Sequence, residues 1–246
     1  TLVLAVREGR GVLDNIRKFL RYLLSSNLAE VLTVLAGVVG AGVLGLSATA
    51  PGTGDGALVL PLLATQILWI NLMTDTGPAL AMGVDPIGED VMARKPRPRG
   101  QRIIDARMGL AVVEAGVVMA VLTLLTLDLF LPGGLIEPVP AWTGPGPHSL
   151  DQARTAAFCV LVLTQLFNCF NARSQTASAF RSAGSNRWLW GAVGVSAALQ
   201  VAVVHIPGLN LAFGTVPLSA GQWAVCVAMA SGVLWFSEAR KLVRRL

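Results

Sequence analysis

The sequence predicts an all-α membrane protein built as a bundle of six transmembrane helices. Hydrophobic residues make up 54% of the 246 positions and charged residues only 13%, whereas soluble domains carry about 25% charged residues. Six apolar stretches roughly reach the length of about 20 residues that a helix needs to cross a bilayer. Lys and Arg gather in alternate connections between these stretches, which is typical of membrane proteins with basic cytoplasmic loops.

The predicted spans follow one another along the whole chain. Their approximate limits are Leu20–Leu46, Ala57–Gly83, Met108–Leu131, Gln152–Asn171, Trp188–Ile206 and Leu218–Ser237. The first span continues a basic, amphipathic segment, and from Val12 onward no Gly occurs before Gly37. We therefore expect one long helix in which residues 1–19 form a stalk, followed by the six-span bundle in residues 20–246. The stalk leads toward a soluble region, so we expect the chain to be the C-terminal piece of a longer protein.

Basic residues predict the orientation of the bundle. They precede or open the first span, fill the second and fourth connections and follow the sixth span, whereas the other three connections contain none. Both termini are therefore expected on the cytoplasmic side of the plasma membrane, with the lipid bilayer as a partner. This topology accounts for the net charge of +5, so no nucleic acid partner is expected. The three cysteines lie inside spans without a CxxC pattern, which favours a packing role.

Several polar residues fall at membrane depth, where a charge is costly and is therefore a functional candidate. Glu30 lies in the first span, and Asn27 precedes it by about one helical turn on the same face. In the second span Asn71, Thr74 and Asp75 fall at i, i+3 and i+4 and would share a face of an α-helix. These polar faces are expected to converge inside the bundle.

The fourth span carries Gln165, Asn168 and Asn171 at intervals of three residues. Amides in spans often only form hydrogen bonds between helices, so Asn168 and Asn171 have a structural as well as a functional interpretation. Glu114 and Asp128 lie near the two ends of the third span. For both, a structural position near the membrane surface is favoured over a functional one.

The second span also contains a helix breaker. Pro78 cannot donate a hydrogen bond to the carbonyl of Thr74, so the helix is expected to unwind near Asp75–Pro78. Carboxylate, amide, hydroxyl and freed carbonyl oxygens together suit a hard cation such as calcium, which takes about six to eight oxygen ligands. A soft metal would require thiolates, and no cysteine is close to Glu30 or Asp75 in the sequence.

Four groups of residues resemble the type II P-type cation ATPases, and in particular the calcium pumps and their bacterial relatives. The groups are Glu8-Gly9-Arg10 with the run from Asn15 to Asn27, the run from Gln66 to Asp75 with Gly77-Pro78-Ala79, Asp90-Val91-Met92 with the run from Arg94 to Arg97, and Leu163-Thr164-Gln165 with Asn168 and Asn171. They resemble, in this order, the stalk with the fifth membrane helix, the sixth helix, the loop after it and the eighth helix. The likeness runs along the whole chain and implies the fifth to tenth helices of a pump that couples ATP hydrolysis to cation transport.

The resemblance also implies a set of cation ligands. Asn27, Glu30, Thr74 and Asp75 would bind one calcium ion, and Asn71 together with Asp75 would serve a second. Gln165 falls where the muscle-type pumps have a glutamate ligand, so the number of ions per cycle stays open. The same scaffold could instead carry manganese, sodium, protons or magnesium.

Motifs that the family needs for ATP hydrolysis do not occur in this sequence. It contains no DKTGT phosphorylation motif, no nucleotide-binding segment and no TGES-like segment, so ATP and Mg²⁺ would act only through other domains. The resemblance also leaves the first four membrane helices of the family without a counterpart. We therefore expect no ATPase activity from this chain alone, and the N-terminal part of the same pump as its partner. The alternative class is a stand-alone membrane channel or scaffold protein.

Overall fold

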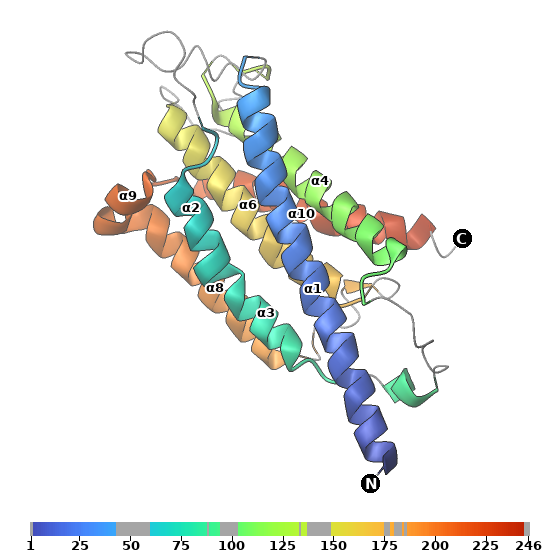
Figure 1. Ribbon diagram of the computed structural model, residues 1–246. Coiled ribbons are helices and arrows are strands. Elements are labelled where there is room, and N and C mark those ends of the chain that lie inside the picture. Colours follow the sequence, from blue (N-terminus) through green and yellow to red (C-terminus); the bar gives the residue numbers. More distant parts are fainter. Residues whose placement is uncertain are drawn as a thin grey trace.

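The computed structural model is a bundle of helices (Figure 1). It describes residues 2–42, 60–87, 89–93, 103–132, 134–136, 149–174, 178–179, 184 and 186–243. Within these ranges every regular element is a helix and no strand occurs. In chain order the elements are α1 (Leu2–Val39), α2 (Ala64–Trp69), η1 (Ile70–Thr74), α3 (Thr76–Gly83), η2 (Glu89–Met92), α4 (Ala106–Phe130), α6 (Leu150–Ala172), α8 (Arg187–His205), α9 (Pro207–Phe213) and α10 (Ala220–Val243).

Five helices in the described ranges are long and apolar enough to cross a membrane, namely α1, α4, α6, α8 and α10. The last four overlap the predicted third to sixth spans, and α1 joins the expected stalk to the expected first span as one continuous helix. Residues 43–46, which the prediction assigned to the first span, lie outside the described part. The predicted number of six spans is not confirmed, because the second predicted span is not a single long helix.

The second predicted span consists of three short elements. The π-helix η1 follows α2 directly, and α3 begins after one intervening residue, Asp75. The backbone N–H of Asp75 donates to the carbonyl of Ile70, five residues earlier, at 3.0 Å, which is the hydrogen bond of a π-turn. The span is therefore interrupted at Ile70–Asp75, which reaches the predicted unwinding near Asp75–Pro78 at Asp75 but does not extend to Pro78. Pro78 is the third residue of α3, where a backbone N–H would have no partner inside the helix, so the helix continues through it.

Helix α6 is the central helix of the bundle and packs against α1, α4, α8 and α10 (Figure 1). It carries small, fully buried residues, among them Ala153, Ala156 and Ala157. Ser149 caps its first turn, because the Oγ atom accepts a hydrogen bond from the backbone N–H of Gln152 at 3.1 Å. Since neighbouring helices cover most of α6, the buried polar side chains of its second half face other helices.

Two glycines allow α1 to approach its neighbours closely. A Cβ atom at Gly116 of α4 would lie 3.0 Å from the side chain of Leu28 in α1. A Cβ atom at Gly37 of α1 would lie 2.5 Å from the side chain of Pro61. Glu30 lies between Leu28 and Gly37 along α1, so these two close contacts fix its position in the bundle.

One end of the bundle, called the basic end below, is where α3, α6 and α10 finish and α4 and α8 begin. Arg17 of α1 pairs there with Asp105 at 2.5 Å, and Arg240 of α10 pairs with Glu114 of α4. At the opposite end of α4, buried Asp128 accepts hydrogen bonds from two backbone N–H groups of the following loop. Glu114 and Asp128 therefore have structural partners, as the sequence indicated.

Candidate functional site

Glu30 of α1 is the centre of a polar cluster inside the bundle. The residue is buried, with 4% of its surface exposed. The Nδ2 atom of Asn71 in η1 donates to Oε2 of Glu30 at 2.6 Å, and the Nε2 atom of Gln165 in α6 donates to Oε1 at 3.0 Å. Three helical elements therefore meet at one carboxylate, although Asn71 and Gln165 are 41 and 135 residues away from it in the sequence.

Asp75, the residue between η1 and α3, is the second buried carboxylate. Only 1% of its surface is exposed. The hydroxyl of Tyr22 in α1 donates to Oδ1 of Asp75 at 2.7 Å, and Asp75 lies four residues after Asn71, which donates to Glu30. The sequence interpretation did not include Tyr22, although Tyr22 and Glu30 are eight residues apart and so lie on the same side of α1.

The π-turn of η1 changes the expected relation between the polar residues of the second predicted span. Thr74 is buried, and its hydroxyl donates to a backbone carbonyl of its own helix at 2.9 Å. The carbonyl of Thr74, which Pro78 leaves without an α-helical donor, accepts a hydrogen bond from Oγ of Ser196 in α8 at 3.3 Å. Asn71 and Asp75 contact different partners on α1, so the predicted common face of the three residues is only partly realised.

Asn27 lies at an open groove on the side of α1. Its Nδ2 atom donates to the carbonyl of Leu23 in the same helix at 2.9 Å, and its side chain is exposed. The groove has a volume of about 510 Å³, and its lining residues are Asn27, Glu30, Val31, Val34, Leu35, Val38 and Ile67. Glu30 is thus reachable from a largely apolar groove that Asn27 shares with it.

The polar residues of α6 divide into two kinds. Asn168 donates to Oγ of Ser25 in α1 at 2.8 Å, and Asn171 donates to the carbonyl of Val233 in α10 at 3.2 Å. The structural interpretation of Asn168 and Asn171, hydrogen bonds between helices, is therefore confirmed. Gln165 differs from them because it contacts a carboxylate. Its buried Oε1 atom, like Oδ1 of Asn171, has no hydrogen-bond partner within the described residues.

The described part of the chain contains no group of three or more His, Cys, Asp or Glu side chains that could hold a metal ion. Its three cysteines are free and buried, in agreement with the packing role indicated by the sequence. A cation at Glu30 and Asp75 would therefore need amide, hydroxyl or carbonyl oxygens as additional ligands, as hard cations accept.

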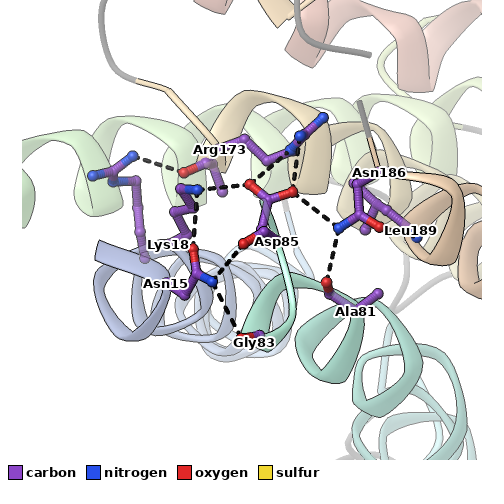
Figure 2. Close-up of polar contacts among 10 residues, drawn as sticks. Asn15, Lys18, Ala81, Gly83, Asp85, Arg173, Asn186 and Leu189 are labelled. Atoms are coloured by element: carbon purple, nitrogen blue, oxygen red, sulfur yellow. Dashed lines mark hydrogen bonds and ion pairs between the residues drawn. The ribbon is translucent and has the colours of Figure 1, made fainter. Parts of the chain in front are cut away.

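A second polar cluster lies at the basic end and is called the Asp85 cluster (Figure 2). Its members are Asn15, Lys18, Asp85, Arg173 and Asn186. Asp85 is buried and follows α3; Nζ of Lys18 lies 2.6 Å from its Oδ2 atom, and Nη2 of Arg173 lies 2.8 Å from Oδ1. Asn186 donates to Oδ1 at 2.9 Å, and Asn15 donates to the main-chain carbonyl of Asp85 at 2.8 Å. The cluster joins α1, the segment after α3, the end of α6 and the start of α8.

The charges of the Asp85 cluster keep its carboxyl ionised. Burial by itself would raise the pKa of Asp85, but the hydrogen bonds and charges of Lys18 and Arg173 outweigh this effect, and the pKa lies below its usual value. The sequence interpretation missed this cluster, because Lys18 and Arg173 are 67 and 88 residues away from Asp85 in the sequence. The available signal was an acidic residue two positions after the end of a predicted span.

The fold and the site define a class of protein: a bundle of apolar helices of membrane length that holds two carboxylates among amides, as ion-transporting membrane proteins do. Residues 59–243 match the family described as Cation transporting ATPase, C-terminus. This match covers most of the chain, and the chain therefore belongs to this family. It is a multi-pass part of a P-type cation ATPase.

Individual relatives resemble the chain along almost its full length. It is 36% identical to the Calcium-transporting ATPase of Bacillus subtilis over 231 residues, which cover 94% of this chain and 23% of that protein. It is 33% identical to the Probable cation-transporting ATPase F of Mycobacterium bovis, over 95% of this chain and 23% of that protein. It is also 33% identical to Calcium-transporting ATPase 1 of Yarrowia lipolytica, over 98% of this chain and 23% of that protein. The chain thus spans about a quarter of the length of these relatives.

Proposed function

We propose that this chain is the membrane transport half of an ATP-driven calcium pump, in which Glu30 and Asp75 bind the transported ion. The relatives from Bacillus subtilis and Bacillus cereus, both described as calcium-transporting ATPases, support calcium as the ion. Because the chain corresponds to about a quarter of their length, phosphorylation by ATP and Mg²⁺ binding would belong to the remainder of the pump. That remainder is the proposed partner of this chain.

Two buried oxygen atoms are the observation on which the proposal depends most. Oδ2 of Asp75 and Oε1 of Gln165 are shielded from solvent and have no hydrogen-bond partner among the described residues. A buried polar atom without a partner is costly, and a buried charge is more costly still. A calcium ion would give such oxygens a partner and would neutralise the negative charges of Glu30 and Asp75.

The remaining ligands would be uncharged. We assign this role to the side-chain oxygens of Asn27, Asn71, Thr74 and Gln165. The amides of Asn71 and Gln165 direct their NH₂ groups toward Glu30, and rotation of each amide would direct its oxygen toward an ion instead. The Thr74 hydroxyl donates its proton within its own helix, so its oxygen can still accept or coordinate.

Release of the ion would leave two carboxylates in an apolar surrounding. Such groups take up protons unless they are paired, because burial disfavours the charged form. Glu30 and Asp75 would therefore alternate between calcium and protons, and transport would be a calcium–proton exchange. The uncharged Gln165 would take no part in the proton half of this exchange.

The proposed membrane arrangement has six spans, with α2, η1 and α3 together as the interrupted second span. The segment from Ala64 to Gly83, with Asp75 included, comprises 20 residues, which at about 1.5 Å each would extend about 30 Å, the thickness of the hydrocarbon core. The basic end would face the cytoplasm, with both termini on that side of the plasma membrane. Residues 1–246 would form one transport domain, with residues 1–19 as its stalk.

Calcium binding by the purified pump that contains this chain tests the proposal. Equilibrium binding of radioactive calcium should be saturable, and Glu30→Gln should weaken it by about tenfold or more, since one carboxylate ligand is lost. Glu114→Gln, which removes a carboxylate paired with Arg240, is the matched control and should leave binding unchanged. Competition by manganese and magnesium compares the alternative ions. Equal calcium binding in the wild type and Glu30→Gln would contradict the proposed site.

A further inference from the structure

We infer that Asp85 is a positioning residue for the candidate cation site, an inference that rests on the proposed function. The elements that meet at Glu30 and Asp75 are α1, η1 with α3, and α6. The Asp85 cluster joins the same elements a second time at the basic end (Figure 2). The cation site and the Asp85 cluster are therefore two polar contacts between one set of helices.

The spacing along the helices supports a direct mechanical link. Lys18 and Glu30 are twelve residues apart on α1, which corresponds to about 18 Å of continuous helix. On α6, Gln165 lies eight residues before Arg173, and Asp85 follows Asp75 by ten residues. A rigid helix transmits a change of position at one end to the other, so a displaced Lys18 or Arg173 would shift Glu30 or Gln165.

The geometry of Asp85 suits this role because its acceptor atoms are engaged from different directions. Oδ2 contacts Lys18 of α1, Oδ1 contacts Arg173 at the end of α6 and Asn186 at the start of α8, and the main-chain carbonyl accepts from Asn15. Bidentate and charge-assisted contacts of this kind are directional as well as strong. Removal of the charge would leave buried Arg173 and half-buried Lys18 without their counter-charge, and the helices would separate or rotate to hydrate them.

The ion pair between Glu114 and Arg240 supplies a matched comparison. It too lies near the basic end and joins two long helices, α4 and α10. Neither α4 nor α10 carries a proposed calcium ligand. Loss of this pair should lower the stability of the bundle without changing the distances among Glu30, Asp75 and Gln165, whereas loss of the Asp85 charge should change both.

The first test compares Asp85→Asn with Glu114→Gln in the complete pump. Asp85→Asn should raise the calcium concentration for half-maximal phosphorylation by about tenfold or more, as mutations that misplace ion ligands do, while the maximal phosphoenzyme level per folded pump is kept. Arg173→Gln should have a similar effect, and the double variant should be little worse than either single one. Glu114→Gln should leave the half-maximal concentration unchanged. An unchanged value in Asp85→Asn would overturn the inference.

The second test does not depend on pump activity. Spin labels at exposed Val31 of α1 and exposed Val195 of α8 report the distance between two helices that the Asp85 cluster joins. Asp85→Asn should broaden or shift this distance distribution, and Glu114→Gln should not. An unaltered distribution in Asp85→Asn would overturn the positioning role even in an active pump. A wild-type pump without calcium dependence would instead refute the proposed function, and the label distances would still decide whether Asp85 fixes the helices.

Discussion

The hydroxyl of Tyr22 donates a hydrogen bond of 2.7 Å to Oδ1 of Asp75 and joins α1 to the residue that separates η1 from α3. Both residues are almost completely buried. Oδ2 of Asp75 has no hydrogen-bond partner in the described part of the chain. Within that part, Tyr22 is therefore the side-chain donor that stabilises the Asp75 carboxyl group. Tyr22 is also the single tyrosine of the sequence.

Tyr22→Phe should therefore destabilise the calcium-free protein. The substitution keeps the ring and removes the donor, so the buried carboxyl group of Asp75 would lose its hydrogen bond at a cost of about 1–3 kcal/mol in the free energy of unfolding. Calcium should reduce the difference between the variant and the wild type, because the ion would stabilise the carboxylate in both. Thermal unfolding in detergent, with and without calcium, measures both effects.

Thr126→Val is the matched control for Tyr22→Phe. Thr126 donates to a carbonyl of its own helix. Its replacement therefore removes a buried hydroxyl but takes no hydrogen bond away from a carboxylate. It should cost less than Tyr22→Phe and should not respond to calcium. Equal, calcium-independent losses in the two variants would mean that the hydrogen bond from Tyr22 does not stabilise the calcium-free site.

Gln165→Glu should strengthen calcium binding. The new carboxylate would lie beside Glu30, where Nε2 of Gln165 contacts Oε1 at 3.0 Å, and would add a negative charge to the proposed ligand shell. We expect the half-saturating calcium concentration to fall by about tenfold, or about 1.4 kcal/mol, or the Hill slope to rise if a second ion is admitted. An unchanged calcium titration would place Gln165 outside the site.

The stabilising effect of Asp85 should depend on pH. The pKa of Asp85 is lower in the folded protein than its usual value, so the ionised carboxylate stabilises the fold above its unfolded pKa of about 4. This contribution is lost as the pH falls through the lower pKa of the folded state. The difference in melting temperature between the wild type and Asp85→Asn should therefore be constant near neutral pH and shrink below about pH 4. A difference that does not change with pH would contradict the ionised state of Asp85.

The long helices could be predicted from the sequence, because their apolar runs are continuous and nearly free of helix breakers. The π-turn in η1 could not be predicted in this way. A proline indicates that a helix is disturbed, but it does not indicate whether a neighbouring helix supplies a donor for the carbonyl that the proline leaves free. Here the carbonyl of Thr74 finds a donor in Ser196 of α8, a residue far away in the sequence. Pro78 consequently remains inside α3.

The candidate site was partly predictable for a similar reason. Charged and amide side chains at membrane depth indicated Glu30, Asp75 and Gln165 as candidates. In the structure Gln165 donates a hydrogen bond to Glu30. The partner of Asp75, and the long-range contacts of Asp85 with Lys18 and Arg173, depend on how the helices pack. A sequence pattern within one helix contains no information about such contacts.

Cysteine labelling tests the proposed topology. Ile104 lies at the basic end, just before α4, whereas Leu135 follows α4 and Leu211 lies in α9 near the opposite end; all three are exposed. Single cysteines at Leu135 and Leu211 should react with an impermeant reagent added outside intact cells, and one at Ile104 should react only after the membrane is opened. The native cysteines are buried, which limits background labelling. Reaction of Leu135→Cys only from the cytoplasmic side would contradict the proposed number of spans.

Asp75 offers the most direct test of the proposed ion site. It is buried and has one oxygen without a hydrogen-bond partner in the described chain. The resemblance to calcium pumps assigns it to both ions. Asp75→Asn is nearly isosteric and easier to bury than a carboxylate, so the bundle should stay folded, as a size-exclusion profile in detergent can verify.

Calcium-dependent phosphoenzyme formation from ATP in the complete pump is the decisive measurement. The wild type should form a phosphoenzyme only when calcium is present, and Asp75→Asn should form none at calcium concentrations that saturate the wild type, because the ion has lost its shared carboxylate ligand. A correctly folded Asp75→Asn pump with the calcium dependence of the wild type would contradict the central claim that Asp75 binds the transported ion.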